Sequence, residues 1–301
     1  MIELGFLPKA KNMRRRNLLI YSLLFIAGCT SVTNNPSGSQ PKKLRFTVTD
    51  ALGIEELKRD YGALQAALKE ILQTDIELVP VESYTAAAAA LQLNQLDFVL
   101  TGPSEYVVMR ARTNAVPVIG ITRPNYRTVI CVSGNSKIKS VAELKGKKIA
   151  MWKIGSTSGY LGPTKLLIDA GLNPQSDLKI VMLGSQGLPG LQKGEVDAWG
   201  GSAVKYEQFL QEQGLSASSL PIIATGPLLP KDLFVASSQL NPEVVKQISS
   251  LLIKDREKIV QSLSAVEEGK YKTSTLVPVN DSEYDMIRDV YKAIGQGSFV
   301  Q

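Results

Sequence analysis

Residues Gly155–Tyr160 read GSTSGY, three consecutive hydroxyl side chains between two glycines, and this stretch decides the fold around it. The preceding run Lys148–Trp152 (KIAMW) has the length and apolar character of a buried strand, whereas apolar residues recur at helical spacing over Tyr160–Ala170. The first turn of a helix carries unpaired N–H groups and the positive end of the helix dipole, so the pattern predicts an anion-binding loop. In the alternative interpretation Ser156 or Ser158 only caps the helix.

The N-terminus has the composition of an export signal. Basic side chains precede an apolar run, Leu18–Ile26, which is too short to span a bilayer stably. These basic residues are Lys9, Lys11, Arg14, Arg15 and Arg16. Residues 1–28 are therefore predicted to be a signal peptide, and its first residue is either Met1 or Met13.

The predicted signal ends at Cys29 within Ile26–Cys29 (IAGC), which resembles the bacterial lipobox. In that motif the cysteine receives lipid and becomes the first residue of the mature protein, so we expect Cys29 to be the lipid anchor. An ordinary signal peptide with an incidental cysteine is the alternative. Residues 29–43 are rich in Ser, Asn, Pro, Gly and Gln, which predicts a flexible tether between the membrane and a folded domain.

The net charge argues against a nucleic-acid-binding protein. The whole chain carries a formal charge of +6, but residues 1–28 contain five basic residues and one acidic residue. Once this segment is removed the charge falls to +2, which is too small for a basic binding surface to be inferred. We therefore expect no nucleic-acid partner.

Histidine is absent from the chain, and cysteine is nearly so. Without histidine, Ser-His-Asp and Cys-His catalysis and most imidazole-based metal sites are excluded. Cys131, in the apolar run Thr128–Val132, is predicted to be a small core residue. No short motif of paired carboxylates stands out, so we expect no catalytic residue, no metal, no cofactor and no enzyme activity.

Strand-like and helix-like segments alternate along the rest of the chain. One series covers residues 44–121, a second covers residues 128–225, and residues 241–263 read as one long amphipathic helix. Such alternation predicts the α/β class, with helices that cover parallel strands. Because ligands bind at the carboxyl ends of the strands in open α/β sheets, two facing sheets would form a cleft between them.

The order of these motifs resembles the substrate-binding proteins of phosphate/phosphite/phosphonate-type ABC transporters, from about Leu44 to the last helix. Its most specific elements are a Gly-Pro-Ser-x-Tyr loop and a Ser-Thr-Ser-Gly-Tyr loop preceded by Leu-Lys-Gly-Lys. The segments that carry the resemblance are Pro80–Tyr84, Leu96–Tyr106, Glu143–Ala150, Ser156–Tyr160, Gly194–Ala198 and Leu229–Asp232.

The resemblance implies a two-lobed periplasmic-binding-protein fold of the type II-like class. Each lobe would contain a mixed sheet with covering helices, and the ligand would bind in the cleft between the lobes. The first lobe would comprise residues 44–126 and 233–301, and the second residues 127–232. The chain would cross between the lobes near Tyr126–Thr128 and near Lys231–Phe234, and these crossings would act as hinges.

The resemblance also assigns residues to the ligand site. Tyr84 and Tyr106 would form the first-lobe wall, each presenting a phenolic O–H group to a bound oxyanion. Ser156, Thr157 and Ser158 would be donors from the second lobe, assisted by backbone N–H groups.

Two further residues concern the choice of ligand. Asp232 would accept a hydrogen bond from a protonated ligand oxygen, which favours ligands that still carry a proton. Gln186 stands where many relatives carry histidine. Because glutamine can donate a hydrogen bond but cannot become cationic, its contact with the ligand stays open.

These expectations describe an extracytoplasmic lipoprotein that captures a small phosphorus oxyanion as a monomer and delivers it to an ABC permease and its ATPase. Phosphite, phosphate or a small phosphonate fits better than an aminoalkylphosphonate, since no acidic residue clearly serves an amino group. The alternatives are a binding protein for sulfonate or sulfate, and a periplasmic sensor module. An enzyme related to the pyrimidine-synthesising proteins of this fold is disfavoured by the export signal and by the absence of histidine.

Overall fold

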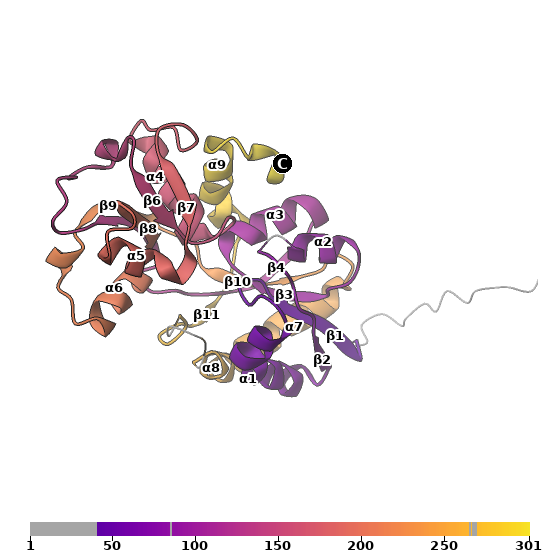
Figure 1. The fold of residues 1–301 in the computed structure, drawn as a ribbon. Helices are drawn as coiled ribbons and strands as arrows, with labels where there is room; N and C mark the ends of the chain where they lie inside the picture. Colours follow the sequence, from indigo (N-terminus) through magenta and orange to yellow (C-terminus); the bar gives the residue numbers. More distant parts are fainter. Residues whose placement is uncertain (1–40, 85, 265, 267–269) are drawn as a thin grey trace, which may run out of the picture. The chain divides into compact units, whose positions relative to one another are not determined.

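A computed structural model describes residues 41–84, 86–264, 266 and 270–301 of the chain (Figure 1). The predicted signal peptide and Cys29 lie outside the described residues, as does most of the predicted tether. Within these described ranges, no helix combines the length and the apolar character that crossing a bilayer requires.

The first of two sheets has six strands in the order β11-β4-β10-β3-β1-β2. The strands β2, β1 and β3 run parallel, whereas β10 is antiparallel to both β3 and β4, and β11 is antiparallel to β4. Their bounds are β1 Lys43–Val48, β2 Asp75–Leu78, β3 Phe98–Thr101, β4 Val116–Ile121, β10 Asp232–Ala236 and β11 Leu276–Val277.

Helices cover both faces of this sheet because the central strands β3 and β10 carry apolar side chains on both faces. Phe98 and Phe234 stack with ring centroids 5.2 Å apart on the face covered by α1 (Ile54–Leu72), α7 (Pro242–Lys254) and α8 (Arg256–Ser262). Val99 and Val235 lie on the other face, under α2 (Ala86–Gln92), α3 (Pro103–Thr113) and α9 (Asp285–Ala293). Such continuous apolar runs are typical of strands buried on both sides.

The prediction of one long helix over residues 241–263 is wrong, because the helix breaks at Asp255 into α7 and α8. Aspartate is unfavourable inside a helix because its side chain competes for the hydrogen bonds of the backbone. For the same reason it is favourable at the start of a helix. Asn241 caps α7 as expected, since its side chain accepts a 2.9 Å hydrogen bond from the backbone N–H of Glu243.

The second sheet has five strands in the order β7-β6-β8-β5-β9. Its strands β7, β6 and β8 are parallel, and β5 is antiparallel to both β8 and β9. The strand bounds are β5 Arg127–Val132, β6 Lys148–Met151, β7 Lys179–Met182, β8 Ala198–Ser202 and β9 Ile222–Leu228. Helices α4 (Gly162–Asp169), α5 (Gly187–Gln192) and α6 (Ala203–Glu212) belong to this half of the molecule.

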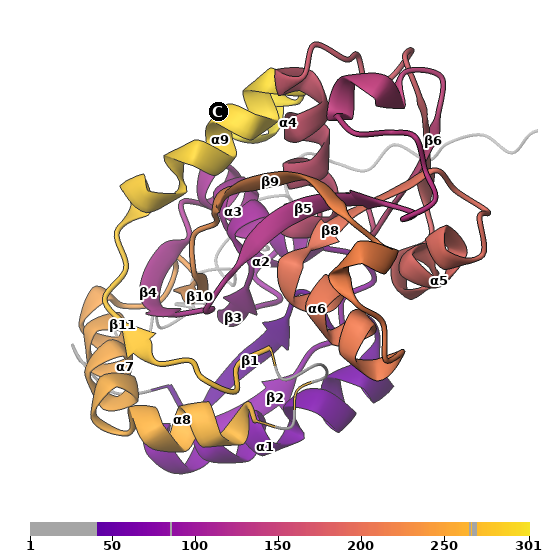
Figure 2. The ribbon, with the colours of Figure 1, turned by 90° about the vertical axis from the view of Figure 1, so that its left-hand side faces the viewer.

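The predicted α/β class with two mixed sheets is confirmed (Figures 1 and 2). We call the first sheet with α1–α3 and α7–α9 the first lobe, and the second sheet with α4–α6 the second lobe. Strand β9, which the sequence analysis does not predict, is a partly exposed edge strand that contains Gly226 and Pro227. Proline is tolerated at such edges because it has no N–H group to donate to a neighbouring strand.

The chain passes between the lobes twice, because the first sheet takes β10 and β11 from the chain beyond the second lobe. One passage lies between β4 and β5, and the other lies between β9 and β10. These passages are hydrogen-bonded to each other, since the N–H group of Leu229 donates to the carbonyl of Tyr126 at 2.8 Å. The two connections therefore lie side by side.

Candidate functional site

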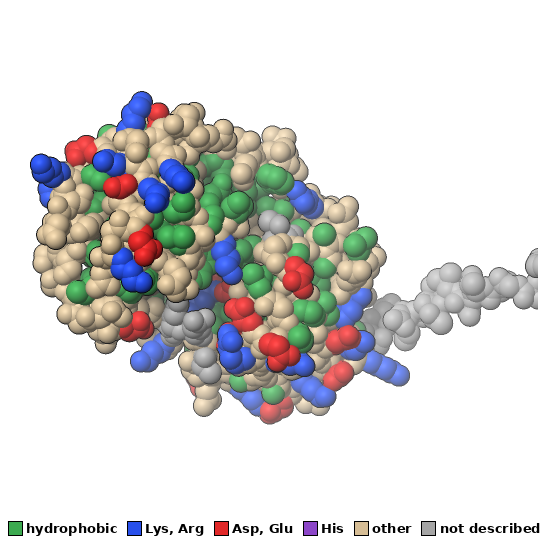
Figure 3. Space-filling model, viewed as in Figure 1, with side chains coloured by type: hydrophobic (Ala, Val, Ile, Leu, Met, Phe, Trp, Pro, Cys, Tyr) green, Lys and Arg blue, Asp and Glu red, His purple; other side chains and the backbone are tan. Residues whose placement is uncertain are grey.

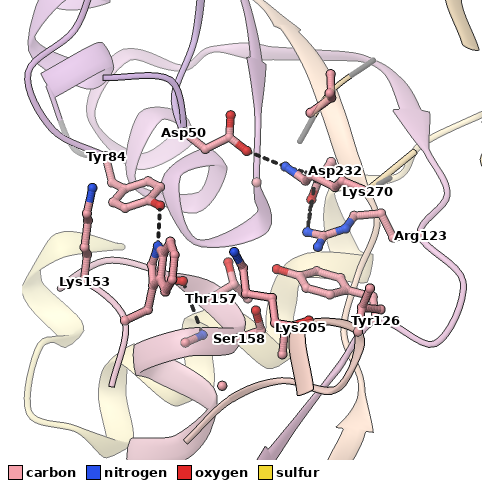
Figure 4. A pocket seen from close by; sticks show the side chains of 18 of the residues that line it. Asp50, Tyr84, Arg123, Tyr126, Lys153, Thr157, Ser158, Lys205, Asp232 and Lys270 are labelled. Carbon is pink, nitrogen blue, oxygen red and sulfur yellow. Dashed lines mark hydrogen bonds and ion pairs between the residues drawn. The ribbon is translucent and has the colours of Figure 1, made fainter. Parts of the chain in front are cut away.

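A cavity of about 160 Å³ is lined by residues of both lobes. Its first-lobe lining includes Asp50, Glu56, Tyr61, Tyr84, Glu105, Arg123, Tyr126, Asp232 and Lys270. Its second-lobe lining includes Trp152, Lys153, Ser156, Thr157, Ser158, Trp199, Ser202 and Lys205. Figure 4 shows several of these side chains around the cavity. On the outer face in Figure 3, by contrast, acidic and basic side chains are interspersed over both lobes.

The loop after β6 turns into a helix as the sequence predicts. Gly155 has a positive φ of 92°, a conformation that suits glycine because it has no Cβ atom. The side chain of Ser156 caps the next turn by accepting a 3.2 Å hydrogen bond from the N–H group of Gly159. Ser156 therefore caps the helix, and it also lines the cavity.

The turn that Ser156 caps is a π-helical turn over Thr157–Leu161, which continues into α4. The carbonyl of Ser156 accepts hydrogen bonds from the N–H groups of both Tyr160 and Leu161, at 3.0 Å each. The N–H groups of Thr157 and Ser158 precede these and occupy the first turn, where no helical acceptor is available. Such wide turns occur frequently at functional sites.

The hydroxyls of Thr157 and Ser158 have different surroundings, although both residues line the cavity. Thr157 Oγ1 donates to Ser104 Oγ at 2.8 Å and accepts from the backbone N–H group of Ser104 at 3.1 Å, which commits it to a contact between the lobes. Ser158 is buried, and its carbonyl accepts a 3.0 Å hydrogen bond from Thr128 Oγ1. Of the two, the hydroxyl of Ser158 is the better donor for a ligand.

Tyr84 lies in the first-lobe wall of the cavity, as expected. The indole N–H of Trp152 in the second lobe donates a 3.1 Å hydrogen bond to the Tyr84 hydroxyl (Figure 4). Burial raises the pKa of Tyr84, so its hydroxyl keeps its proton at neutral pH. The Tyr84 O–H group can therefore still donate into the cavity.

Tyr106 does not line the cavity, which corrects the sequence prediction. It is fully buried in the first lobe, with its ring edge-on to that of Tyr284 at a centroid distance of 4.7 Å. Its hydroxyl donates a 2.5 Å hydrogen bond to Asp281 Oδ1. The helix α3 directs Tyr106 toward the C-terminal part of the lobe, whereas Tyr126 lies in the cavity wall.

Asp232 lines the cavity, but its carboxylate already has three partners. Lys270 Nζ lies 2.9 Å and Arg123 Nη1 3.3 Å from its oxygens, and the Tyr271 hydroxyl donates to it at 2.7 Å. Burial would raise the pKa of Asp232, but the two cations and these hydrogen bonds lower it below the ordinary value. The expected hydrogen bond from a protonated ligand would have to compete with these partners.

Asp232 belongs to a row of alternating charges that the sequence analysis missed. Lys270 also contacts Asp50 Oδ2 at 2.5 Å, and Asp50 accepts a 2.8 Å hydrogen bond from the hydroxyl of Tyr61. At the other end, the guanidinium of Arg123 lies 3.6 Å from the centroid of the Tyr126 ring. No motif marks Lys270 or Arg123, because their roles depend on loops that meet only in the folded protein.

The second lobe adds positive charge to the cavity through Lys153 and Lys205. Lys205 Nζ lies 3.9 Å from the centroid of the Trp152 ring, at a distance typical of a cation–π contact. Lys153 is exposed. These two side chains place positive charge on the second-lobe side of the site, and no sequence motif marks either of them.

Glu105 is a buried carboxyl group of the cavity wall that no sequence motif marks as functional. Burial raises its pKa to about 7, and the charges of Asp232 and Asp50 add to this increase, whereas hydrogen bonds from Ser104 and from its own backbone oppose it. At neutral pH a substantial fraction of Glu105 is therefore protonated.

Gln186 is exposed and does not line the cavity, so the structure does not place it at the site. It ends a short turn over Gly184–Gln186, which begins at a positive φ of 54°. Gly184 and Ser185 of this turn line a neighbouring cavity of about 150 Å³, whose lining shares Trp152, Trp199 and Lys205 with the first cavity.

Comparisons with known proteins identify the family. The family model for the periplasmic substrate-binding protein of phosphonate ABC transporters matches residues 46–284. The phosphate-import protein PhnD of Mycolicibacterium smegmatis is 23% identical over an alignment of 282 positions, which covers 85% of this chain and 87% of that protein.

Solved structures show the same fold. PhnD1 of Prochlorococcus marinus, in complex with methylphosphonate, aligns with a TM-score of 0.70 at 19% identity, over 85% of this chain and all of that chain. The aliphatic sulphonate-binding protein SsuA of Escherichia coli aligns with a TM-score of 0.57 at 20% identity, over 87% of this chain and 89% of that one. Because the family model covers most of its length, this chain belongs to the periplasmic substrate-binding proteins of phosphonate-type ABC transporters.

Proposed function

We propose that this protein captures a small phosphorus oxyanion, namely phosphite, phosphate or a small phosphonate, and delivers it to an ABC permease. The observation that carries the proposal is the π-helical turn at Thr157–Leu161, whose first N–H groups and Ser158 lie at the cavity of a phosphonate-family protein. Backbone N–H groups at a helix start bind phosphate-like anions without any cationic partner.

The size and the chemistry of the cavity support a small anion. A volume of about 160 Å³ is below the usual range for drug-sized ligands, about 300–1,000 Å³. Tyr84 and Ser158 supply hydroxyl donors from opposite lobes, and Lys205 supplies positive charge. An oxyanion between the lobes would therefore receive hydrogen bonds from both of them.

The relatives support phosphorus over sulfur as the central atom of the bound anion. The Mycolicibacterium relative is named for phosphate import. The structure of the Prochlorococcus protein contains methylphosphonate and aligns with this chain at a TM-score of 0.70. The sulphonate-binding protein of Escherichia coli aligns at 0.57, and its ligands form the second candidate class because the same donors serve both.

Titration calorimetry of the full chain tests this proposal. The ligands are phosphite, phosphate, methylphosphonate, aminoethylphosphonate, sulfate and methanesulfonate. We expect the three smaller phosphorus anions to bind at least tenfold more tightly than either sulfur anion. Tighter binding of sulfate or methanesulfonate would favour the second candidate class, and no binding of any phosphorus anion would overturn the proposal.

Ligand capture would close the two lobes about the passages near residues 122–126 and 229–231. These passages lie just before the expected hinges at Tyr126–Thr128 and Lys231–Phe234, because Arg127 and Asp232 already begin strands β5 and β10. The hydrogen bond between Leu229 and Tyr126 holds these passages together, so they would bend as one hinge. Small-angle scattering should detect a smaller radius of gyration when the tightest ligand from the titration is added. An unchanged radius would contradict this hinge.

We further propose that Cys29 carries a lipid that holds the monomeric protein at the outer face of the cytoplasmic membrane or in the periplasm, with no enzyme activity of its own. The basis is the IAGC sequence at Ile26–Cys29 and the tether-like composition of residues 29–43. Mass spectrometry of the membrane-bound protein should find diacylglyceryl-modified Cys29 at the N-terminus. An unmodified N-terminus at a later residue would refute the lipid anchor.

A further inference from the structure

A joint between the lobes is centred on the hydroxyl of Ser104, at the start of α3. Ser104 Oγ lies 2.6 Å from the carbonyl oxygen of Gly155 in the second lobe and 2.6 Å from Glu105 Oε2. It also accepts a 2.8 Å hydrogen bond from Thr157 Oγ1. All of these side-chain groups are buried.

The number of protons at this joint is limited. A serine hydroxyl has one proton and two lone pairs, a backbone carbonyl can only accept, and an ionised carboxylate can only accept. If Glu105 is ionised, the Ser104 proton can reach Glu105 or Gly155 but not both. The remaining pair of oxygens would then face each other at 2.6 Å with no proton between them, which is repulsive.

A neutral Glu105 satisfies every group. In that state the carboxyl O–H would donate to Ser104 Oγ across the same 2.6 Å, and Ser104 would donate its own proton to the carbonyl of Gly155. The second lone pair of Ser104 Oγ accepts the proton of Thr157 Oγ1. The joint is therefore complete only when Glu105 carries a proton.

The surroundings of Glu105 agree with the neutral form. Asp232 at the start of β10 and Asp50 after β1 oppose a negative charge there, and the hydroxyls of Tyr84, Tyr126 and Tyr291 are the other titratable groups that interact with it. The cations of the first-lobe wall, Arg123 and Lys270, are ion-paired with Asp232 and Asp50. Thr49 Oγ1 donates to Glu105 Oε1 at a long 3.4 Å.

We propose that Glu105 is a positioning residue that joins the lobes as a neutral acid, so that closure around a ligand takes up one proton from solution. When the lobes separate, Ser104 loses its hydrogen bonds to Gly155 and Thr157. Water then reaches Glu105, and its carboxyl group can release the proton. The ligand part of this inference rests on the proposed function, whereas the joint itself is a property of the two lobes.

Calorimetry with methylphosphonate at about pH 6, in buffers with different ionisation enthalpies, measures the number of protons taken up. The ordinary pKa of a glutamate carboxyl lies below that pH, and the pKa of Glu105 in the closed form is about 7. We expect the full wild-type chain to take up close to one proton more than its Glu105→Gln variant. The ionisation of the ligand is the same in both titrations, so it cancels in the difference.

The Glu105→Gln variant should bind methylphosphonate normally at about pH 6, because its amide N–H can donate to Ser104 Oγ as the neutral acid does. Relative to the variant, the affinity of the wild type should fall by up to about tenfold for each pH unit between the ordinary glutamate pKa and about 7, and should level off above about 7, where Glu105 is ionised in both the open and the closed form. Ser104→Ala should also abolish the extra proton. Glu55→Gln, which removes an exposed carboxylate outside both the joint and the cavity wall, should leave proton uptake at the wild-type value.

A measurement without ligand separates this inference from the proposed function. Small-angle scattering of the ligand-free chain should show a radius of gyration that rises between about pH 5 and pH 7 in the wild type but not in Glu105→Gln. Identical proton uptake in wild type and Glu105→Gln, or identical scattering profiles for the two, would overturn the proposal. Failure of every phosphorus anion to bind would overturn the proposed function, and the scattering comparison would still test the joint.

Discussion

The indole N–H of Trp152 in the second lobe donates a 3.1 Å hydrogen bond to the hydroxyl of Tyr84 in the first lobe, in the wall of the cavity. Tyr84 and Tyr106 were predicted from the sequence to have the same role, but only Tyr84 has this contact. Tyr106 instead donates its hydroxyl proton to Asp281 within the first lobe. This difference leads to opposite predictions for the two tyrosines.

Tyr84→Phe should weaken binding of the phosphorus anion about ten- to a hundredfold, because a hydrogen bond to a charged ligand contributes roughly 1.5–3 kcal/mol. The free energy of unfolding should change little, since Tyr84 lies in the wall of a cavity. Calorimetry measures the affinity and urea denaturation measures the stability. Tyr160→Phe, a tyrosine outside the cavity lining, is the matched control, and an unchanged affinity in Tyr84→Phe would remove Tyr84 from the site.

Tyr106→Phe should show the reverse pattern. Its hydroxyl bonds to a carboxylate that Arg288 also contacts at 2.7 Å, so its loss should lower the free energy of unfolding by roughly 1.5–3 kcal/mol. The affinity for the anion should stay within about twofold of the wild type. A tenfold weaker affinity with normal stability would restore the role that the sequence suggested for Tyr106.

Ser156→Ala and Ser158→Ala should separate capping from ligand binding. Ser156 accepts the N–H group of Gly159, so its loss should cost about 0.5–2 kcal/mol of stability, as expected for an N-cap. Ser158 lines the cavity, so loss of its hydroxyl should weaken binding of the anion about ten- to a hundredfold, while the free energy of unfolding stays nearly constant. Equal affinities in the wild type and in a folded Ser156/Thr157/Ser158 triple-alanine variant would place the oxyanion site elsewhere.

Asp232→Asn should destabilise the protein, because it leaves Arg123 and Lys270 without a shared buried counter-charge. Breaking a buried ion pair by removing one partner costs about 3–5 kcal/mol, a large part of the stability of a typical domain. Asp289→Asn, which removes a carboxylate paired with Lys292 at an exposed position, is the control and should have almost no effect.

The effect of Asp232 should depend on pH in a defined direction. Its pKa is lowered in the folded protein, so its stabilisation is complete above the ordinary pKa of about 3.8 and is lost as the pH falls through the lower folded value. The stability difference between wild type and Asp232→Asn should therefore be constant near neutral pH and shrink in acid. A difference that grows in acid would show that Asp232 does not neutralise these cations.

Local patterns in the sequence predicted the parts of the fold that depend on neighbours along the chain. The β6 strand, the glycine loop and the helix after it follow from apolar periodicity and from Gly155, and the cap at Asn241 follows from residue type. The edge strand β9 was missed because its partly exposed residues and Pro227 give no strong alternation.

The polar part of the site depends on distant segments and could not be predicted in the same way. Asp232 was recognised from its loop, but its partners Arg123 and Lys270 come from other loops that carry no motif. Glu105 was visible next to Ser104 in the sequence, yet its state depends on burial and on Gly155 from the other lobe. Tyr106 was misplaced because the resemblance fixes a position along α3 but not the face of the helix.

The central position of β10 in the first sheet also sets the order in which the protein can fold. The strands β3 and β4 both pair with β10, which follows the entire second lobe along the chain. Before residue 236 has crossed the membrane, β3 can pair only with β1 and β4 has no partner strand, so both present open edges of the kind that promote aggregation. The second lobe, by contrast, is one continuous segment able to form its own core. A chain that crosses a membrane unfolded from its N-terminus would therefore assemble its second lobe before its first.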